Sequence, residues 1–293
     1  DYNWYINCTA NEVTNQSASR TIGIGINFSR CGILIDSNGH YNLISNLNNV
    51  PDCCITIPGY VINTTLDCLG HTIAGTTGVS MKIDGDNNTI TNCVVNNIND
   101  PIRVYGDYNN LTNIETYGGT KWSTSAGIYI SGSYNWLYNI STHDNSNGMC
   151  FSASHNTVTY SVFYDNSKCL YFPYNNVNTF YNNIFNCSSP VSDGYPFTSL
   201  TYWNTTQQIG SRIIPSGNYI GGNYWTNPDN TGFSDNCPDE NVDFICDNSY
   251  SLPGGADYLP LTPYSIRTVN LTITNDSTPD FNFTITGNQN IYS

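Results

Sequence analysis

Apolar residues recur along this chain as triplets in which one variable residue separates two apolar ones. The steps between successive triplets are 26, 21, 26, 21 and 21 residues. Each triplet has the two-residue period of a β-strand, and a repeat of about 20 to 50 residues indicates a solenoid. The triplets are Ile55-Thr-Ile57, Met81-Lys-Ile83, Ile102-Arg-Val104, Ile128-Tyr-Ile130, Met149-Cys-Phe151 and Leu170-Tyr-Phe172.

Asparagines recur in step with these triplets, and each is followed two residues later by an apolar side chain. With a third, weaker apolar stretch they make three short strands per coil, which predicts an all-β, right-handed parallel β-helix with little helix content. We expect asparagine amides to bond from coil to coil at the corners. An antiparallel sandwich also explains alternating strands, but not a register held over five repeats. The asparagines are Asn88, Asn109, Asn135, Asn156 and Asn178.

The register of the repeat divides the chain into four parts. We predict an N-terminal cap over 1–28, the β-helix over 29–215, a closing module with an acidic loop over 216–264, and a β-hairpin tail over 265–293. A lone hairpin is marginally stable in water, so the tail must dock on its own solenoid or on another subunit, and we expect strand addition to another subunit. Its apolar face comprises Val269, Leu271, Ile273, Phe281, Phe283 and Ile285.

The net charge of the chain excludes some classes of binding partner. The formal net charge is −14, with eight Lys and Arg among 293 residues. A chain so poor in cations cannot neutralise a phosphate backbone, which argues against nucleic acid and against anionic membrane surfaces. No apolar run reaches the length that a membrane span needs.

Cysteine usage and glycosylation sequons indicate the compartment. The chain has 11 Cys without a CxxC pair, which favours disulfides formed outside the cytosol. We therefore expect an extracellular, cell-surface protein whose signal peptide has been removed. Sequons agree with this, although several arise by chance in a chain rich in Asn and Thr. Their asparagines are Asn7, Asn15, Asn27, Asn63, Asn87, Asn110, Asn139, Asn186, Asn204, Asn270, Asn275 and Asn282.

The repeat also predicts disulfide pairs. Equivalent positions in adjacent coils lie about 4.8 Å apart, which is within disulfide reach. An odd number of cysteines leaves a thiol for another chain, and Cys8 is the first candidate. The remaining unassigned cysteines are Cys53 and Cys187. The predicted pairs are Cys31 with Cys54, Cys68 with Cys93, Cys150 with Cys169, and Cys237 with Cys246 across a single loop.

Two regions carry a family resemblance. The opening coils contain Cys31-Gly-Ile-Leu-Ile35 and Thr65-Leu-Asp-Cys-Leu-Gly-His-Thr-Ile-Ala-Gly75, and the closing region contains Gly221-Gly-Asn-Tyr-Trp225 and Asp257-Tyr-Leu-Pro-Leu261. From roughly residue 30 to 264 the chain resembles archaeal extracellular β-helix proteins, in the group that includes NosD-type periplasmic proteins and pectate-lyase-like solenoids. The resemblance implies a secreted surface protein.

The strongest candidate site in the sequence is the acidic loop. Oxygen ligands at short alternating spacings suit a hard cation, so we predict a structural Ca²⁺ that stiffens the closing module. Phe244 stands where the family pattern has glycine, which lowers the expected affinity, and a solvated acidic loop is the alternative. The predicted ligands are Asp235, Asp239, Asn241, Asp243 and Asp247.

Catalytic patterns are weak. Lys82 and Arg103 are the only basic residues at one phase of adjacent coils, and no carboxylate pair or histidine triad accompanies them. We therefore predict no enzymatic activity. A copper metallochaperone is disfavoured by two Met and no His cluster. Outward aromatic side chains can instead form a sugar-stacking strip or an assembly face, and the examples are Tyr129, Tyr134, Trp136 and Tyr171.

These features together predict a non-catalytic structural protein. We expect it to build an extracellular sheath, layer or filament from copies of itself, through strand and disulfide contacts between subunits. The alternative is a carbohydrate-binding or polysaccharide-cleaving β-helix that works on cell-surface glycans along its flank.

Overall fold

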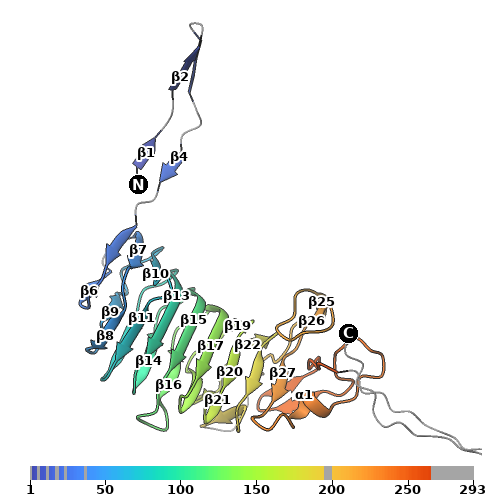
Figure 1. Ribbon diagram of the computed structural model, residues 1–293. Coiled ribbons are helices and arrows are strands. Elements are labelled where there is room, and N and C mark those ends of the chain that lie inside the picture. The colour runs from blue at the N-terminus through green and yellow to red at the C-terminus, as the bar shows by residue number, and fades with distance from the viewer. Residues whose placement is uncertain are drawn as a thin grey trace, which may run out of the picture.

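The computed structural model describes residues 2–4, 7–10, 13–16, 20–22, 25–35, 38–194 and 200–264. Its body is a parallel β-helix, as the repeat predicts (Figure 1). One eight-stranded sheet, here called the first sheet, runs along one side of the solenoid. Its strands are β6 (Ile33–Leu34), β9 (Ile55–Ile57), β12 (Val79–Ile83), β14 (Asp100–Val104), β16 (Ala126–Ile130), β18 (Asn147–Phe151), β21 (Lys168–Phe172) and β24 (Val191–Asp193).

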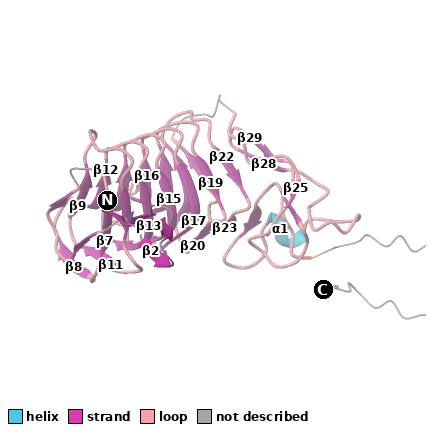
Figure 2. Cartoon of the chain, turned by 90° about the horizontal axis from the view of Figure 1, so that it is seen from above, coloured by secondary structure: helices cyan, strands magenta, loops and turns pink. Residues whose placement is uncertain are grey.

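A second sheet of 13 strands supplies the other two sides of each coil. In the middle coils one eight-residue strand bends through both sides, whereas in the outer coils two short strands do so (Figure 2). The strands are β5 (Ile26–Phe28), β7 (His40–Leu43), β8 (Leu47–Val50), β10 (Thr65–Asp67), β11 (Thr72–Gly75), β13 (Thr89–Asn96), β15 (Asn110–Tyr117), β17 (Trp136–His143), β19 (Thr157–Thr159), β20 (Val162–Tyr164), β22 (Thr179–Tyr181), β23 (Ile184–Asn186) and β27 (Tyr224–Thr226).

The remaining elements form small units of their own. Antiparallel pairs join β1 (Tyr2–Trp4) to β4 (Arg20–Ile22) and β2 (Asn7–Ala10) to β3 (Val13–Gln16). Towards the C-terminus, β25 (Gln208–Ile209) pairs with β26 (Tyr219–Ile220), and β28 (Tyr250–Leu252) pairs with β29 (Gly255–Asp257). The one helix among the described residues is α1 (Phe233–Asn236).

The last residue of each apolar triplet stacks on its equivalent in the next coil. Strand register places these side chains one over another, and all of them are 0% exposed. The rings of Phe151 and Phe172 continue the row with centroids 5.7 Å apart. Each coil buries its apolar face only against its neighbours, so stacking supplies the core. The row is Ile57, Ile83, Val104, Ile130, Phe151 and Phe172.

The asparagine column bonds from coil to coil. The side-chain Oδ1 atoms of Asn109, Asn135, Asn156 and Asn178 each accept a hydrogen bond from the backbone N–H of the asparagine one coil earlier, at 2.7 to 2.9 Å. Asn88 Oδ1 accepts the N–H of Thr64 at 2.9 Å. These residues are buried, so the bonds satisfy backbone groups at the corner between the two sheets. The left-handed backbone belongs to the residue before four of the five asparagines: Asn87, Tyr108, Tyr134 and His155 have φ of 56° to 65°.

The coil stack is longer than predicted at both ends. Strand β5 pairs with β7, so the stack begins before residue 29, and β27 pairs with β23, so it continues after residue 215. Trp225 of β27 lies over Phe185 with ring centroids 4.4 Å apart, and Trp203 stacks on Phe180 at 5.1 Å. These two buried indoles close the C-terminal end of the apolar core. The predicted tail hairpin over 265–293 lies outside the described residues.

Candidate functional site

A groove of about 310 Å³ lies on the outer face of the first sheet. The sequence builds it by lengthening one coil. The step from Ile102 to Ile128 is 26 residues, and the extra residues form the loop 118–125 between β15 and β16. This loop is the wall of the groove, and outward side chains of β14, β16, β18 and β21 are its floor.

An ion pair fixes the base of this wall to the floor. Asp100 is 4% exposed, and its Oδ2 accepts hydrogen bonds from Arg103 Nε at 2.9 Å and Nη2 at 2.5 Å. Its Oδ1 accepts the backbone N–H of Ala126, the first residue after the loop, at 2.9 Å. Hydrogen bonds to an ionised group are stronger than neutral ones, so one carboxylate holds both the guanidinium and the loop end.

Aromatic side chains line the rest of the groove. Trp122 on the loop is 59% exposed and Tyr174 beyond β21 is 60% exposed. Between them, the Tyr129 hydroxyl accepts a hydrogen bond from Ser152 Oγ at 2.8 Å. Cys150 lies beneath as a buried free thiol, and burial raises its pKa to about 12. Exposed rings beside fixed polar groups are the chemistry of a site that binds a small, partly apolar ligand such as a sugar.

Four cations lie over aromatic rings on this side of the solenoid. Arg103 Cζ is 5.6 Å from the centroid of the Tyr129 ring, and Lys82 Nζ of the preceding coil is 5.4 Å from that of Tyr105. The two other cations are lysines that lie over rings lining the groove. Lys121 Nζ lies 5.6 Å from the Trp122 ring and Lys168 Nζ lies 5.1 Å from the Tyr171 ring.

The predicted aromatic strip is divided by the structure. Tyr129 and Tyr171 line the groove, whereas Tyr134 and Trp136 lie at the corner after β16 and on β17 of the second sheet. Tyr134 is the centre of a stacked column, with ring centroids 5.0 Å from Tyr108 and 4.8 Å from His155. Rings stacked face to face present edges to solvent, so this column offers a sugar little stacking surface.

Sequence reasoning missed Trp122, Asp100 and Tyr174 as site residues. The signal that could have located Trp122 was the longer step in the repeat, because extra residues in a solenoid coil form a loop on its surface. Lys82 and Arg103 point outward as predicted, and each has its own carboxylate.

The acidic loop is held together by its own backbone rather than by convergent carboxylates. Asp239 is buried and accepts the N–H groups of Asp243 and Phe244, and Asp247 accepts that of Glu240. Asp235 lies apart on α1, where it accepts the hydroxyls of Tyr224 and Thr226. Across the described residues, no group of three His, Cys, Asp or Glu side chains is arranged to hold a metal ion. All five predicted ligands accept hydrogen bonds from N–H or hydroxyl groups of the chain, and the Ca²⁺ site stays a prediction.

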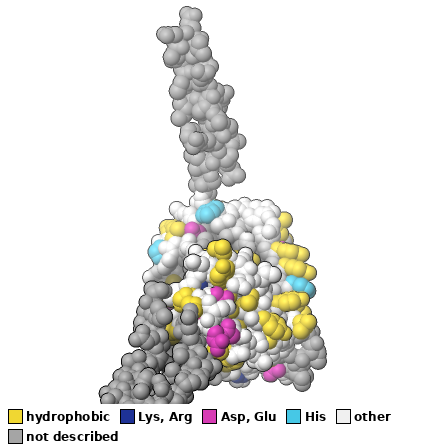
Figure 3. All heavy atoms as spheres, turned by 90° about the vertical axis from the view of Figure 1, so that its right-hand side faces the viewer, with side chains coloured by type: hydrophobic (Ala, Val, Ile, Leu, Met, Phe, Trp, Pro, Cys, Tyr) yellow, Lys and Arg dark blue, Asp and Glu magenta, His cyan; other side chains and the backbone are white. Residues whose placement is uncertain are grey.

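A partly buried cation of the chain itself lies beside this loop. Arg212 donates from Nη2 to the Thr262 carbonyl at 3.1 Å. Burial lowers the pKa of Arg212 to about 10, and the nearby carboxylates of Asp243 and Asp239 act in the opposite direction. The guanidinium therefore supplies positive charge where the sequence suggested a metal. Figure 3 shows acidic side chains gathered on this C-terminal face of the molecule.

The disulfides follow the coil register, with one correction. The structure contains Cys31–Cys54, Cys68–Cys93 and Cys237–Cys246. The predicted pair of Cys150 with Cys169 is wrong, because Cys169 bonds to Cys187. Register sets Tyr171, not Cys169, beside Cys150, which leaves Cys150 free. Cys53 is also free, and the side chain of Cys8 lies outside the described part.

Five predicted glycosylation asparagines are exposed, and two are partly buried. The other five, Asn7, Asn15, Asn270, Asn275 and Asn282, have side chains outside the described residues. The exposed ones are Asn27, Asn63, Asn87, Asn110 and Asn139, and the partly buried ones are Asn186 and Asn204.

Comparison with protein families matches residues 3–230 to the family described as "Periplasmic copper-binding protein (NosD)". The chain belongs to the NosD family. Among solved structures, "The complex structure of XylC with xylose" matches with a TM-score of 0.36 and 11% identity, covering 68% of this chain and 43% of that chain. No curated protein matches.

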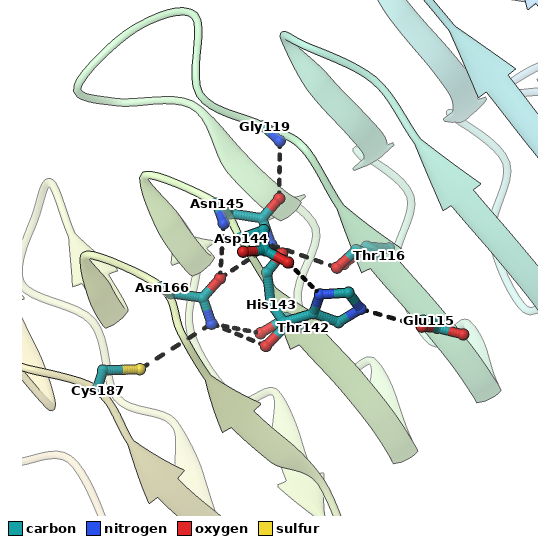
Figure 4. A network of polar contacts seen from close by, with 9 residues as sticks. All are labelled: Glu115, Thr116, Gly119, Thr142, His143, Asp144, Asn145, Asn166 and Cys187. Atoms are coloured by element: carbon teal, nitrogen blue, oxygen red, sulfur yellow. Dashed lines mark hydrogen bonds and ion pairs between the residues drawn. The ribbon is translucent and has the colours of Figure 1, made fainter. Parts of the chain in front are cut away.

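Copper does not fit the described side chains of this NosD-family chain. Cu sites use imidazole, thiolate and thioether ligands. Both methionines, Met81 and Met149, are 0% exposed in the core. His143 has both ring nitrogens engaged, Nδ1 with Asp144 at 2.8 Å and Nε2 with Glu115 at 3.0 Å (Figure 4). Among the described residues, His and Cys do not gather with each other or with acidic side chains in a group of three that could hold a metal ion.

Membership of the NosD family agrees with the predicted location on the extracytoplasmic side of a membrane. Disulfides point to the same oxidising environment. Within the described part of the chain, no helix has the length and apolar character to cross a bilayer.

Proposed function

We propose that this NosD-family protein is a non-catalytic, glycan-binding component of the extracellular surface, with the groove on the first sheet as its binding site. The observation that carries the proposal is the exposure of Trp122 and Tyr174 at a groove whose floor is fixed by the ion pair of Asp100 with Arg103. A rigid sheet with exposed rings and fixed donors recognises a sugar without paying a large ordering cost.

Two features favour binding over cleavage. Glycoside hydrolysis uses two carboxyl groups that flank the bond, and Asp100 is the only carboxylate among the groove's described lining residues. A β-elimination needs a basic group that can accept a proton. Burial acts to lower the pKa of Arg103, but hydrogen bonds to Asp100 outweigh it and raise the pKa, so the guanidinium stays protonated.

Calorimetric titration against a panel of oligosaccharides tests the proposal. We expect Trp122→Ala and Tyr174→Ala each to weaken binding of a recognised glycan by about tenfold, because exposed aromatic anchors dominate such sites. Tyr60→Ala is the matched control, since Tyr60 is 68% exposed and does not line the groove. Failure of every glycan to bind, or equal affinities in all four proteins, contradicts the proposal.

A second candidate function is a building block of a sheath, layer or filament. The supporting observation is that Cys53 carries a free, partly exposed thiol although eight cysteines are paired within the chain. The other elements proposed for assembly, Cys8 and the tail, lie outside the described side chains. Light scattering and a non-reducing gel test this role. A chain ending at residue 264 that forms multimers of unchanged size opposes strand exchange by the tail.

A further inference from the structure

We propose that the groove takes an anionic polysaccharide, whose carboxylate or sulfate groups meet the ammonium groups of Lys121 and Lys168. This inference rests on the proposed glycan-binding function and assigns its ligand class. It follows from where the few cations of the chain are placed.

Positive charge is concentrated on one face of an acidic protein. The chain has eight Lys and Arg against 22 Asp and Glu. Four of these cations each lie over an aromatic ring on the first-sheet side of the solenoid, and three of those rings line the groove. A protein with a net charge of −14 repels a polyanion at long range, so a polyanion binds only where cations are gathered.

The acids near the groove do not cancel this charge. Asp84 pairs with Lys82 at 2.7 Å, and Asp100 pairs with Arg103. Neither Lys121 nor Lys168 has an ion pair with a described acidic residue. The two ammonium groups are therefore available to a ligand at the edge of the groove, whose own lining carries only the mutually paired charges of Asp100 and Arg103.

The two lysines lie on different coils. Asn147 registers with Ala126 on one side and with Lys168 on the other, so Lys168 lies two strands from the end of the loop that carries Lys121. Two strand spacings are about 10 Å. A ligand that reaches both cations must run along the solenoid axis, across the strands, as an extended polymer does.

The ring contacts argue against a neutral sugar. The amino groups lie over the rings of Trp122 and Tyr171, and the Arg103 guanidinium lies over that of Tyr129. A cation on the face of a ring takes the place of a sugar's apolar face, and it still offers N–H donors to an anion. The groove therefore presents ring-supported cations in addition to the outer surfaces of Trp122 and Tyr174.

The test compares each charged polymer with an uncharged counterpart. Calorimetry uses an oligogalacturonate against its methyl ester, and dextran sulfate against dextran. Lys121→Gln and Lys168→Gln each remove one charge beside the groove, and Arg30→Gln is the control that changes net charge equally at an exposed site on another coil. We expect about threefold weaker binding for each lysine variant, about tenfold for the double variant, and no change for the control.

The salt dependence of the affinity and the choice of polymer distinguish anionic recognition from binding of a neutral glycan. We expect affinity for the charged polymer to fall as NaCl rises from about 0.05 to 0.5 M, because screening weakens exposed charge contacts. Preference for dextran sulfate or for oligogalacturonate assigns the anion as sulfate or carboxylate. Equal, salt-independent binding of charged and uncharged polymers overturns the anionic assignment but leaves glycan binding standing. Absence of binding to any polymer overturns both.

Discussion

Asp100 binds Arg103 with one carboxylate oxygen and, with the other, the backbone N–H of Ala126, the residue directly after the groove-wall loop. The pair lies at the start of β14 and spans an i, i+3 separation on a strand, so the guanidinium folds back along the floor. Loss of this pair thus affects both the stability of the loop and the position of a groove cation.

Replacing Asp100 tests that double role. Asp100→Asn keeps an acceptor for the Ala126 N–H but leaves Arg103 without a counter-charge, and we expect it to lower the free energy of unfolding by about 1 to 2 kcal/mol. Asp100→Ala removes both contacts and costs about 3 kcal/mol. Urea denaturation measures both. Asp84→Asn, which breaks a more exposed pair, changes stability by less than about 0.5 kcal/mol. Similar losses in all three variants disagree with this account.

Replacing an asparagine of the buried column should lower the free energy of unfolding more than replacing an asparagine that bonds to its neighbour at the surface. Asn156 Oδ1 accepts both the N–H and the Nδ2 of Asn135. Asn156→Ala leaves these buried donors unsatisfied, and we expect it to cost about 2 to 4 kcal/mol. Asn113, whose amide donates to Asn92 at the surface, is the control. Asn113→Ala costs less than about 1 kcal/mol, and a reversed order in thermal or urea unfolding contradicts the prediction.

His143 makes stability depend on pH. Its ring stacks between Tyr117 and Tyr164, with centroids at 5.1 and 4.8 Å. Burial acts to lower the pKa of His143, but the hydrogen bonds to Asp144 and Glu115 outweigh it and raise the pKa above 6.5. The folded state therefore binds the proton more tightly, so this stabilisation is complete below pH 6.5 and is lost as pH rises through the folded pKa.

The difference in unfolding free energy between the wild type and His143→Gln measures this effect. We expect the wild type to lose its advantage as the pH rises above 6.5 and through the raised pKa of the folded state. The NMR titration of the imidazole gives the pKa directly. A pKa below 6.5, or a difference that does not vary with pH, refutes the assignment.

The two free thiols should differ in reactivity. Cys53 is partly exposed, whereas Cys150 is buried with a pKa raised to about 12 by desolvation. Since the thiolate is the reactive form, we expect a maleimide to label Cys53 of the native protein first and Cys150 only after unfolding.

Peptide mapping without reduction should recover Cys169 joined to Cys187. Recovery of Cys150 joined to Cys169 shows the register of β18 and β21 to be different.

Calcium provides a test of the closing module. The sequence predicts a Ca²⁺ site, but the loop carboxylates accept backbone N–H groups, and Arg212 lies beside Asp239 and Asp243. We expect EDTA and added Ca²⁺ to leave the melting temperature unchanged within about 1 °C, because a ligand stabilises only the state that binds it. A rise that grows with Ca²⁺ concentration and disappears in Asp243→Asn restores the predicted site.

The sequence by itself determined the architecture, because stacked coils must repeat the same inward side chains in every turn. The row from Ile57 to Phe172 and the asparagines from Asn88 to Asn178 follow from this, and so do the disulfides between cysteines of adjacent coils that lie within one residue of register. Local spacing was enough wherever residues of adjacent coils face each other.

Tertiary structure alone decided the site. The groove brings together Asp100, Trp122 and Tyr174, which come from a strand and a loop of one coil and from a corner of another. The repeat specifies which residues point outward, but not how a loop folds over its neighbours or which acid meets which base. The same reason explains Cys169, whose partner depends on the path of the chain between β23 and β24. Contacts within the repeat are periodic and visible in the sequence, whereas contacts made by its insertions depend on three-dimensional packing.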